Sequence, residues 1–251
     1  NIYGVDIEKG AVDIARLRFW LSIVVDEETP SPLPNLDYKI MQGNSLIESF
    51  MGVDLSKLTY EKECKKDKGE ISLFDDEKNR LQKTVSHLLS SYYSCSDHDK
   101  KVKLQQEISD TISKQLEAQA YNPSILAKLK EINLAENNKF FLWHTWFTDV
   151  FNRDDEKNGF DIVIGNPPYV VVSDVDKERL YYKYKTKNCL ELYSYFFEHS
   201  INILHHNGVL SFITGSLYTK GIKFEPLRIF LENNSQLIAY RNEGDEVFKN
   251  V

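Results

Sequence analysis

The feature that most constrains this chain is an apolar run that ends in two consecutive prolines. Residues 160–169 read Phe-Asp-Ile-Val-Ile-Gly-Asn-Pro-Pro-Tyr. A short apolar run bounded by a turn signal predicts a strand buried on both faces, as in a parallel sheet. Parallel strands are joined through helices, so the run predicts an α/β fold.

The loop after this strand is stiff and rich in hydrogen-bond acceptors. Pro167 and Pro168 have a fixed φ and no N–H to donate. The Asn166 amide oxygen and the loop carbonyls are therefore acceptors at the carboxyl end of a strand, where open α/β sheets bind ligands. With the ring of Tyr169 beside them, these acceptors suit a planar ring that carries an exocyclic amine. A proline-rich turn that only ends the strand is the alternative interpretation.

Composition narrows the class of protein. The chain has 251 residues, enough for one sizeable α/β domain with an appendage. The net charge of −7 argues against a generic basic nucleic-acid binder, so any DNA contact must rest on a local patch or on a partner segment. No apolar run approaches the length of a membrane span, which predicts a soluble protein.

The cysteine and acidic residues predict neither a disulfide framework nor a metal site. Cys64, Cys95 and Cys189 have no metal-type spacing, and their odd number fits a reducing, cytoplasmic setting. The acidic residues 154–156 lack ligand-spaced partners for a metal.

Several segments beside the loop carry a family resemblance. Asn166-Pro167-Pro168-Tyr169 resembles the catalytic motif of the S-adenosylmethionine-dependent amino-methyltransferases, especially the N6-adenine DNA methyltransferases. The flanking segments resemble the subgroup of restriction–modification systems, in which methylation and cleavage often share one polypeptide. These segments are residues 4–7 (Gly-Val-Asp-Ile), 42–46 (Gln-Gly-Asn-Ser-Leu), 192–197 and 208–213.

The resemblance implies a Rossmann-like methyltransferase sheet with an inserted helical hairpin. Residues 1–51 would form the first part of the core, residues 52–139 the helical insertion, and residues 140–251 the second part with the Asn-Pro-Pro-Tyr loop. None of the 11 glycines forms a Gly-x-Gly. We therefore expect the first strand and its Gly-rich turn to precede Asn1, and a fragment without them to be inactive alone.

The cofactor residues implied by the resemblance are Asp6, Ile7, Asn44, Ser45 and Asn166. A carboxylate at the end of such a strand accepts hydrogen bonds from ribose hydroxyls, so Asp6 would hold the ribose of S-adenosylmethionine. Asn44 would lie near the cofactor adenine. Two local interpretations stay open, because Asp6 also suits a helix N-cap and Asn44 also suits a turn.

Periodicity predicts the remaining elements. It predicts strands over residues 2–7, 38–42, 209–214 and 236–241, and helices over residues 8–25, 189–204 and 225–231. The first helix would bury Ala11, Ala15, Phe19 and Ser22, and His205 and His206 would occupy the last turn of the second. The hairpin would bury Leu81, Val85, Leu88, Tyr92, Leu104, Ile108, Ile112 and Leu116. The aromatic residues of 140–151 are expected in the core, beside the strand that leads to the loop.

The residues expected to contact substrate follow the loop. Lys177, Arg179, Lys183 and Lys185 alternate with aromatic residues, a pattern suited to neutralising DNA phosphates. An exposed amphipathic helix is the alternative. Phe248 resembles the family residue that supplies a second ring against the target base, and an ordinary core Phe is equally compatible.

The function implied is methyl transfer from S-adenosylmethionine to the N6 amine of a flipped-out adenine in double-stranded DNA. Asn166, Pro167, Pro168 and Tyr169 would form the catalytic loop, without a metal. The partners would include a target-recognition domain and a nuclease domain in the full-length chain. A protein glutamine N5-methyltransferase, an RNA-adenine methyltransferase and a non-catalytic scaffold or specificity module remain alternatives.

Overall fold

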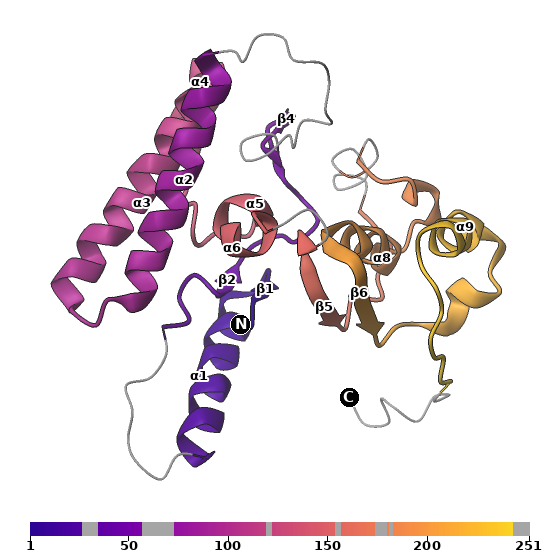
Figure 1. Ribbon diagram of the computed structural model, residues 1–251. Coiled ribbons are helices and arrows are strands. Elements are labelled where there is room, and N and C mark those ends of the chain that lie inside the picture. The colour runs from indigo at the N-terminus through magenta and orange to yellow at the C-terminus, as the bar shows by residue number, and fades with distance from the viewer. Residues whose placement is uncertain are drawn as a thin grey trace. The chain divides into compact units, whose positions relative to one another are not determined.

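A computed structural model describes residues 1–26, 35–56, 73–118, 122–153, 157–173, 180 and 183–242. The chain forms two compact units, residues 1–152 and residues 153–251 (Figure 1). Within the described ranges, no helix is both long enough and apolar enough to cross a bilayer.

The first unit begins with a β-α-β arrangement. Strand β1 (Gly4–Asp6) and strand β2 (Ile40–Gln42) pair in parallel, with Asp6 opposite Gln42, and helix α1 (Lys9–Asp26) connects them. The buried face of α1 is centred on Val12, with Ala15 and Phe19 beside it. The expected face was wrong at its two ends, because Ala11 and Ser22 are exposed.

The aromatic residues after position 139 lie in the core of this unit, which confirms their predicted burial, whereas their position beside the strand at residues 160–165 stays a prediction. Helices α5 (Trp143–Trp146) and α6 (Thr148–Phe151) bury most of their side chains. Trp146 stacks on Tyr38, with 5.5 Å between the ring centroids. The Phe141 N–H donates to the Ile47 carbonyl, at 2.9 Å, close to the short hairpin of β3 (Ser49–Phe50) and β4 (Val53–Asp54). The cluster thus packs on residues 38–50.

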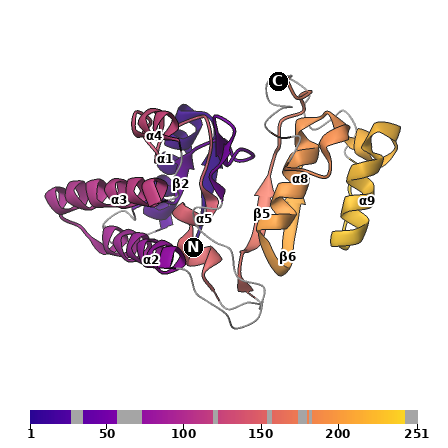
Figure 2. The same ribbon diagram turned by 90° about the horizontal axis from the view of Figure 1, so that it is seen from above.

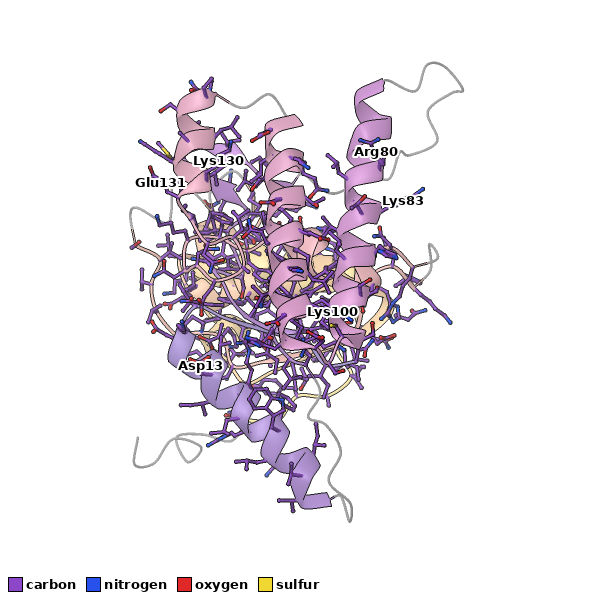
Figure 3. The ribbon with its side chains drawn as sticks, turned by 90° about the vertical axis from the view of Figure 1, so that its left-hand side faces the viewer. Asp13, Arg80, Lys83, Lys100, Lys130 and Glu131 are labelled. Carbon is purple, nitrogen blue, oxygen red and sulfur yellow. The ribbon has the colours of Figure 1, made fainter. Side chains whose placement is uncertain are left out.

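The predicted helical hairpin is present. Helices α2 (Leu73–Ser94) and α3 (His98–Ala118) pack along each other (Figure 1), and α4 (Pro123–Lys130) follows with Asn122 as its N-cap. The buried positions include Leu81, Val85, Leu89, Tyr92, Ile108, Ile112 and Leu116. Leu88 and Leu104 are only partly buried. Charged side chains, including the labelled Arg80, Lys83 and Lys100, are exposed (Figure 3).

Two tyrosines attach the hairpin to the rest of the unit. The Tyr92 hydroxyl donates to the Asp37 carboxylate at 2.7 Å, and the Tyr93 hydroxyl donates to the Tyr38 carbonyl at 3.0 Å. Burial raises the pKa of Tyr92 to about 12 and that of Tyr93 further, so both hydroxyls stay protonated at neutral pH. Both donors therefore persist through the physiological pH range.

The second unit is built on one parallel pair of strands. Strand β5 (Phe160–Gly165) pairs with β6 (Leu204–Phe212), with Gly165 opposite Phe212. Helix α8 (Leu192–Ile203) lies between the strand pair and helix α9 (Glu225–Asn234), as Figure 2 shows. Three short 3-10 turns, η3 (Lys187–Cys189), η4 (Ser216–Thr219) and η5 (Ile222–Phe224), pack with α9 around a core of Cys189, Tyr193, Phe197, Phe224 and Leu227.

Three expectations about this unit were wrong. Ile162 and Ile164 of β5 are 64% and 78% exposed instead of buried, because β6 is the one strand among the described residues that pairs with β5. His205 and His206 lie in β6 instead of a helical turn, because α8 ends at Ile203 and the register shifts between Phe160 and Ile162. Residues 236–241 form no strand, since no described strand pairs with them.

The close contact between Gly43 and Phe141 gives a test of the first unit. A Cβ at Gly43 would lie 2.5 Å from Phe141 Cδ2, whereas a Cβ at Gly10 in α1 meets no atom within 4 Å. We expect Gly43→Ala to lower the free energy of unfolding by about 1–3 kcal/mol through overpacking. Gly10→Ala, the matched control, should raise it by roughly 0.5 kcal/mol. Urea unfolding measures both, and an unchanged midpoint for Gly43→Ala would contradict the packing described.

Candidate active site

The Asn-Pro-Pro-Tyr loop leaves the carboxyl end of β5 beside the end of β6. The Gly165 carbonyl accepts from the Ile213 N–H at 3.1 Å, which extends the parallel ladder up to the loop. A Cβ at Gly165 would lie 3.0 Å from the Phe212 ring, so glycine lets that ring pack against the strand. Asn166 therefore begins the loop at a fixed position at the sheet end.

The Tyr169 hydroxyl ties the two ends of this corner together. It lies 2.6 Å from Asn166 Oδ1 and 3.0 Å from the Ile213 carbonyl oxygen, and its one hydrogen is shared between these two acceptors. Partial burial raises the pKa of Tyr169, so the phenol is protonated and donates at neutral pH. The Asn166 amide oxygen thus accepts a hydrogen bond within the loop itself.

The loop is open to solvent on its polar side. Pro167 is buried and anchors the loop, whereas Asn166 and Pro168 are exposed. Tyr169 is 42% exposed, and its ring meets the edge of Tyr193 with 6.5 Å between centroids. The oxygen acceptor and an aromatic surface therefore face solvent together.

The segment after the loop is fixed by backbone pairing. Val171 bridges antiparallel to Glu191. The Val172 N–H donates to the Leu190 carbonyl at 2.8 Å, and the Leu192 N–H donates to the Val170 carbonyl at 2.9 Å. The loop is consequently anchored before Asn166 by β6 and after Tyr169 by the segment that leads into α8.

The cofactor candidates of the first unit lie together at the carboxyl ends of β1 and β2. The Gly43 N–H donates to the Asp6 carbonyl, and Gln42 Nε2 donates to the Ile7 carbonyl, both at 2.9 Å. Asn44 and Ser45 follow Gly43 directly and are half-buried, and Asp6 is exposed. Two parallel strands thus bring Asp6 and Ile7 beside Asn44 and Ser45.

Both polar side chains of this group also have local partners. Asp6 Oδ1 accepts from the Glu8 N–H at 2.8 Å, beside the start of α1, and Asn44 Oδ1 accepts from the Leu46 N–H at 3.2 Å. The turn interpretation of Asn44 is therefore satisfied, whereas Asp6 bonds the Glu8 N–H just before α1 and, among the described residues, no N–H of the first turn of that helix. A role in cofactor binding has to coexist with these bonds.

The expected substrate residues are described only in part. Lys183 and Lys185 are exposed and lie in turns that lead into η3. Lys177, Arg179 and Phe248 lie outside the described residues. Within the described ranges, no group of three His, Cys, Asp or Glu side chains is placed to hold a metal ion.

One residue that the sequence did not single out is Glu198. Its side chain is on the inner side of α8, the residue is 2% exposed, and its carboxylate accepts two backbone N–H groups of the lysine-bearing turn. The signal was a charged residue that directly follows two phenylalanines of an otherwise apolar helix.

An α/β chain in which a parallel strand ends in an exposed acceptor loop has features expected of a methyltransferase. Residues 1–248 match the family described as Eco57I restriction-modification methylase. The chain therefore belongs to this family of restriction–modification methylases.

Curated relatives carry matching names. The chain is 26% identical, over 277 residues and 91% of its length, to the putative type II restriction enzyme and methyltransferase RM.MjaORFECS2P of Methanocaldococcus jannaschii. It is 37% identical over 101 residues, 36% of the chain, to the type II restriction enzyme and methyltransferase RM.Eco57I of Escherichia coli. It is 31% identical over 100 residues, 38% of the chain, to the type II methyltransferase M.BstVI of Geobacillus stearothermophilus. The matches span 23%, 10% and 16% of these relatives, respectively.

Proposed function

We propose that this chain is the methyl-transfer part of a restriction–modification enzyme that methylates the N6 amine of adenine in double-stranded DNA. Family membership supports methyl transfer, and relatives named restriction enzyme and methyltransferase support a nuclease in the full-length protein. A target-recognition domain in the full-length protein is part of the same proposal. The observation that carries the choice of an amine is the Asn166 oxygen, exposed and accepting from a hydroxyl donor.

The chemistry assigned to the loop is activation of an amine nitrogen. Asn166 Oδ1 and the Pro167 carbonyl would accept the two amine hydrogens, which localises the nitrogen lone pair as it attacks the methyl carbon. As the nitrogen–carbon bond forms and the carbon–sulfur bond of the donor breaks, positive charge would develop on that nitrogen, and preorganised oxygen acceptors would stabilise that charge. The donor would leave as a neutral thioether, and one amine hydrogen would leave as a proton to solvent. The Tyr169 hydroxyl already donates to Asn166 Oδ1, so an incoming amine hydrogen would use the second lone pair of that oxygen or displace the hydroxyl.

The target adenine has to leave the duplex to reach such a loop. A flipped base is held by stacking between aromatic or apolar side chains. The Tyr169 ring, 42% exposed beside its acceptor, suits this role, and Phe248 is proposed as the second ring. The phosphates on either side would meet Lys183 and Lys185, with Lys177 and Arg179 in the same segment of sequence.

The methyl donor proposed is S-adenosylmethionine, whose sulfonium carries the transferable methyl group. The ends of β1 and β2 suit part of it, because Asp6 presents an exposed carboxylate and ribose hydroxyls are donors. Asn44, with Ser45 beside it, has an amide available for the adenine edge. A Rossmann-like sheet is the architecture that this assignment implies, and the parallel β1–β2 and β5–β6 pairs support it.

Substitution of Asn166 tests the catalytic assignment in the full-length enzyme. Asn166→Ala removes the side-chain acceptor, and we expect the single-turnover rate of methyl transfer to fall by about 10²–10³. Asn166→Asp, which keeps an acceptor oxygen at the same position, should retain much more activity. DNA affinity should be unchanged in both variants. A near-normal rate for Asn166→Ala would refute the role of this oxygen.

Two substitutions of Tyr169 distinguish the role of its ring from the role of its hydroxyl. Tyr169→Phe keeps the stacking surface and removes the donor that competes for Asn166, so we expect a transfer rate within about threefold of the wild type. Tyr169→Ala removes a stacking interaction of about 1–3 kcal/mol and should lower kcat/KM for DNA by roughly one to two orders of magnitude. Equal losses in both variants would show that the hydroxyl, and not the ring, is required.

Protein glutamine N5-methylation is the second candidate, because the same Asn-Pro-Pro-Tyr motif suits a side-chain amide nitrogen. Radiolabelled S-adenosylmethionine, offered with duplex DNA, single-stranded RNA or a glutamine-bearing protein, distinguishes the acceptors. We expect label in duplex DNA. Cofactor binding without transfer to any acceptor, or no cofactor binding at all, would favour a scaffold or specificity module instead.

A further inference from the structure

We propose that Glu198 is a positioning residue that holds the lysine turn (residues 183–187) in the conformation that contacts DNA phosphates. This inference rests on the proposed function and adds a residue that the sequence motifs do not contain. Three observations support it: the carboxylate is buried, it binds the backbone of the turn, and helix α8 connects that turn to the Asn-Pro-Pro-Tyr loop.

The Glu198 carboxylate makes a bidentate contact with the backbone, with one hydrogen bond to each oxygen. Glu198 Oε1 accepts from the Lys185 N–H at 2.9 Å, and Oε2 accepts from the Thr186 N–H at 2.8 Å. The residue is 2% exposed, and burying a carboxylate is costly unless hydrogen bonds compensate for its lost hydration. Two consecutive N–H groups aimed at one carboxylate fix the backbone of the turn at Lys185.

Three further contacts join the same turn to α8. Tyr195 donates its hydroxyl to the Lys187 carbonyl at 2.8 Å, and Thr186 Oγ1 donates to the Ser194 carbonyl at 3.4 Å. The Tyr184 hydroxyl lies 3.4 Å from His199 Nδ1. Helix α8 therefore contacts four consecutive residues of the turn.

The side chains of the turn alternate between the interior and solvent. Tyr184 and Thr186 are buried against α8, whereas Lys183 and Lys185 are exposed and Lys187 is half-buried. The buried alternate residues leave Lys183 and Lys185 accessible to solvent, and Lys183 Nζ lies 5.4 Å from the centroid of the Tyr184 ring. The contacts with α8 thus involve the backbone and the buried residues of the turn, and they leave Lys183 and Lys185 accessible to solvent.

The same helix joins this turn to the catalytic loop. Tyr193, in the first turn of α8, meets the ring of Tyr169, and the segment just before α8 pairs with residues 170–172. A phosphate-binding turn held on α8 therefore keeps a fixed distance from the loop that would receive the flipped base. Loss of the Glu198 contact should free the lysines without removing any of them.

The test is the salt dependence of DNA binding by the full-length enzyme. Each phosphate contact contributes about −0.9 to the slope of log K against log salt concentration. Lys185→Ala should make the slope shallower by about 1. Glu198→Gln keeps one acceptor but turns an amide N–H₂ toward the second backbone N–H, so we expect a slope shallower by about 1–2. DNA affinity at moderate salt should fall at least fivefold, with S-adenosylmethionine affinity unchanged.

Glu191→Gln is the matched control. It removes the same charge from the same unit, but its carboxylate pairs with Lys223 at 2.8 Å and not with the turn. Its slope should equal that of the wild type. The double variant Glu198→Gln/Lys185→Ala should bind no more weakly than Glu198→Gln alone, because the freed lysine has already lost its contact.

Each other outcome has a distinct meaning. A wild-type slope for Glu198→Gln, together with a shallower slope for Lys185→Ala, overturns the positioning role. Unchanged slopes in both variants overturn DNA contact by the turn, and absence of methyl transfer to DNA by the wild type overturns the proposed function itself. If Glu198→Gln does not fold, Tyr195→Phe replaces it, because it removes only the bond to the Lys187 carbonyl. A shallower slope then supports the proposal and an unchanged slope overturns it.

Discussion

The pairing of β5 with β6 is the interaction on which the candidate site depends. It continues past the regular strands, because the Gly165 carbonyl accepts from Ile213 and the Ile213 carbonyl accepts from Tyr169. The ladder therefore fixes both the backbone before Asn166 and the ring after the prolines. A loop without N–H donors at its two proline positions makes no backbone hydrogen bonds from them, so the ladder and the Tyr169 hydroxyl hold it instead.

The second unit combines this ladder with one helix that has several roles. Helix α8 covers the strand pair, contributes Tyr193 and Phe197 to the core, and binds the lysine turn through Glu198. A chain with a net charge of −7 gains little from its overall field when it approaches a polyanion. Under the proposed contact with DNA, local placement of a few cations would compensate, and the buried hydrogen bonds of the lysine turn would make that placement rigid.

Local signals made much of this architecture predictable. The proline pair and apolar run identified the loop at the end of β5, and helical spacing identified α2 and α3, because both patterns depend on residues near each other in sequence. The start of β6 at Leu204 was missed because its first residues pair across a register shift and include Asn207 with a φ of 69°, an irregularity that sequence spacing does not show. The exposure of Ile162 and the absence of a strand at residues 236–241 depend on pairing partners that sequence spacing does not reveal.

The residues of the candidate site likewise fall into those that local sequence identifies and those that depend on contacts between distant segments. Asn166 and Tyr169 could be chosen from their own chemistry, whereas the Tyr169 contact with Ile213 joins residues 44 positions apart. Glu198 bonds the N–H groups of Thr186 and Lys185, which lie 12 and 13 positions earlier in the chain. Neither segment has a sequence pattern that predicts this contact. Asp6 and Asn44 illustrate a different difficulty, because a residue that satisfies a local turn gives the same sequence signal as one that binds a ligand.

The measurement that tests the central claim most directly identifies the atom that receives the methyl group. Duplex DNA treated with the full-length enzyme and isotopically labelled S-adenosylmethionine is digested to nucleosides and analysed by mass spectrometry. The account predicts labelled N6-methyladenine as the product. Labelled N4-methylcytosine, or label confined to glutamine side chains of protein, would contradict it.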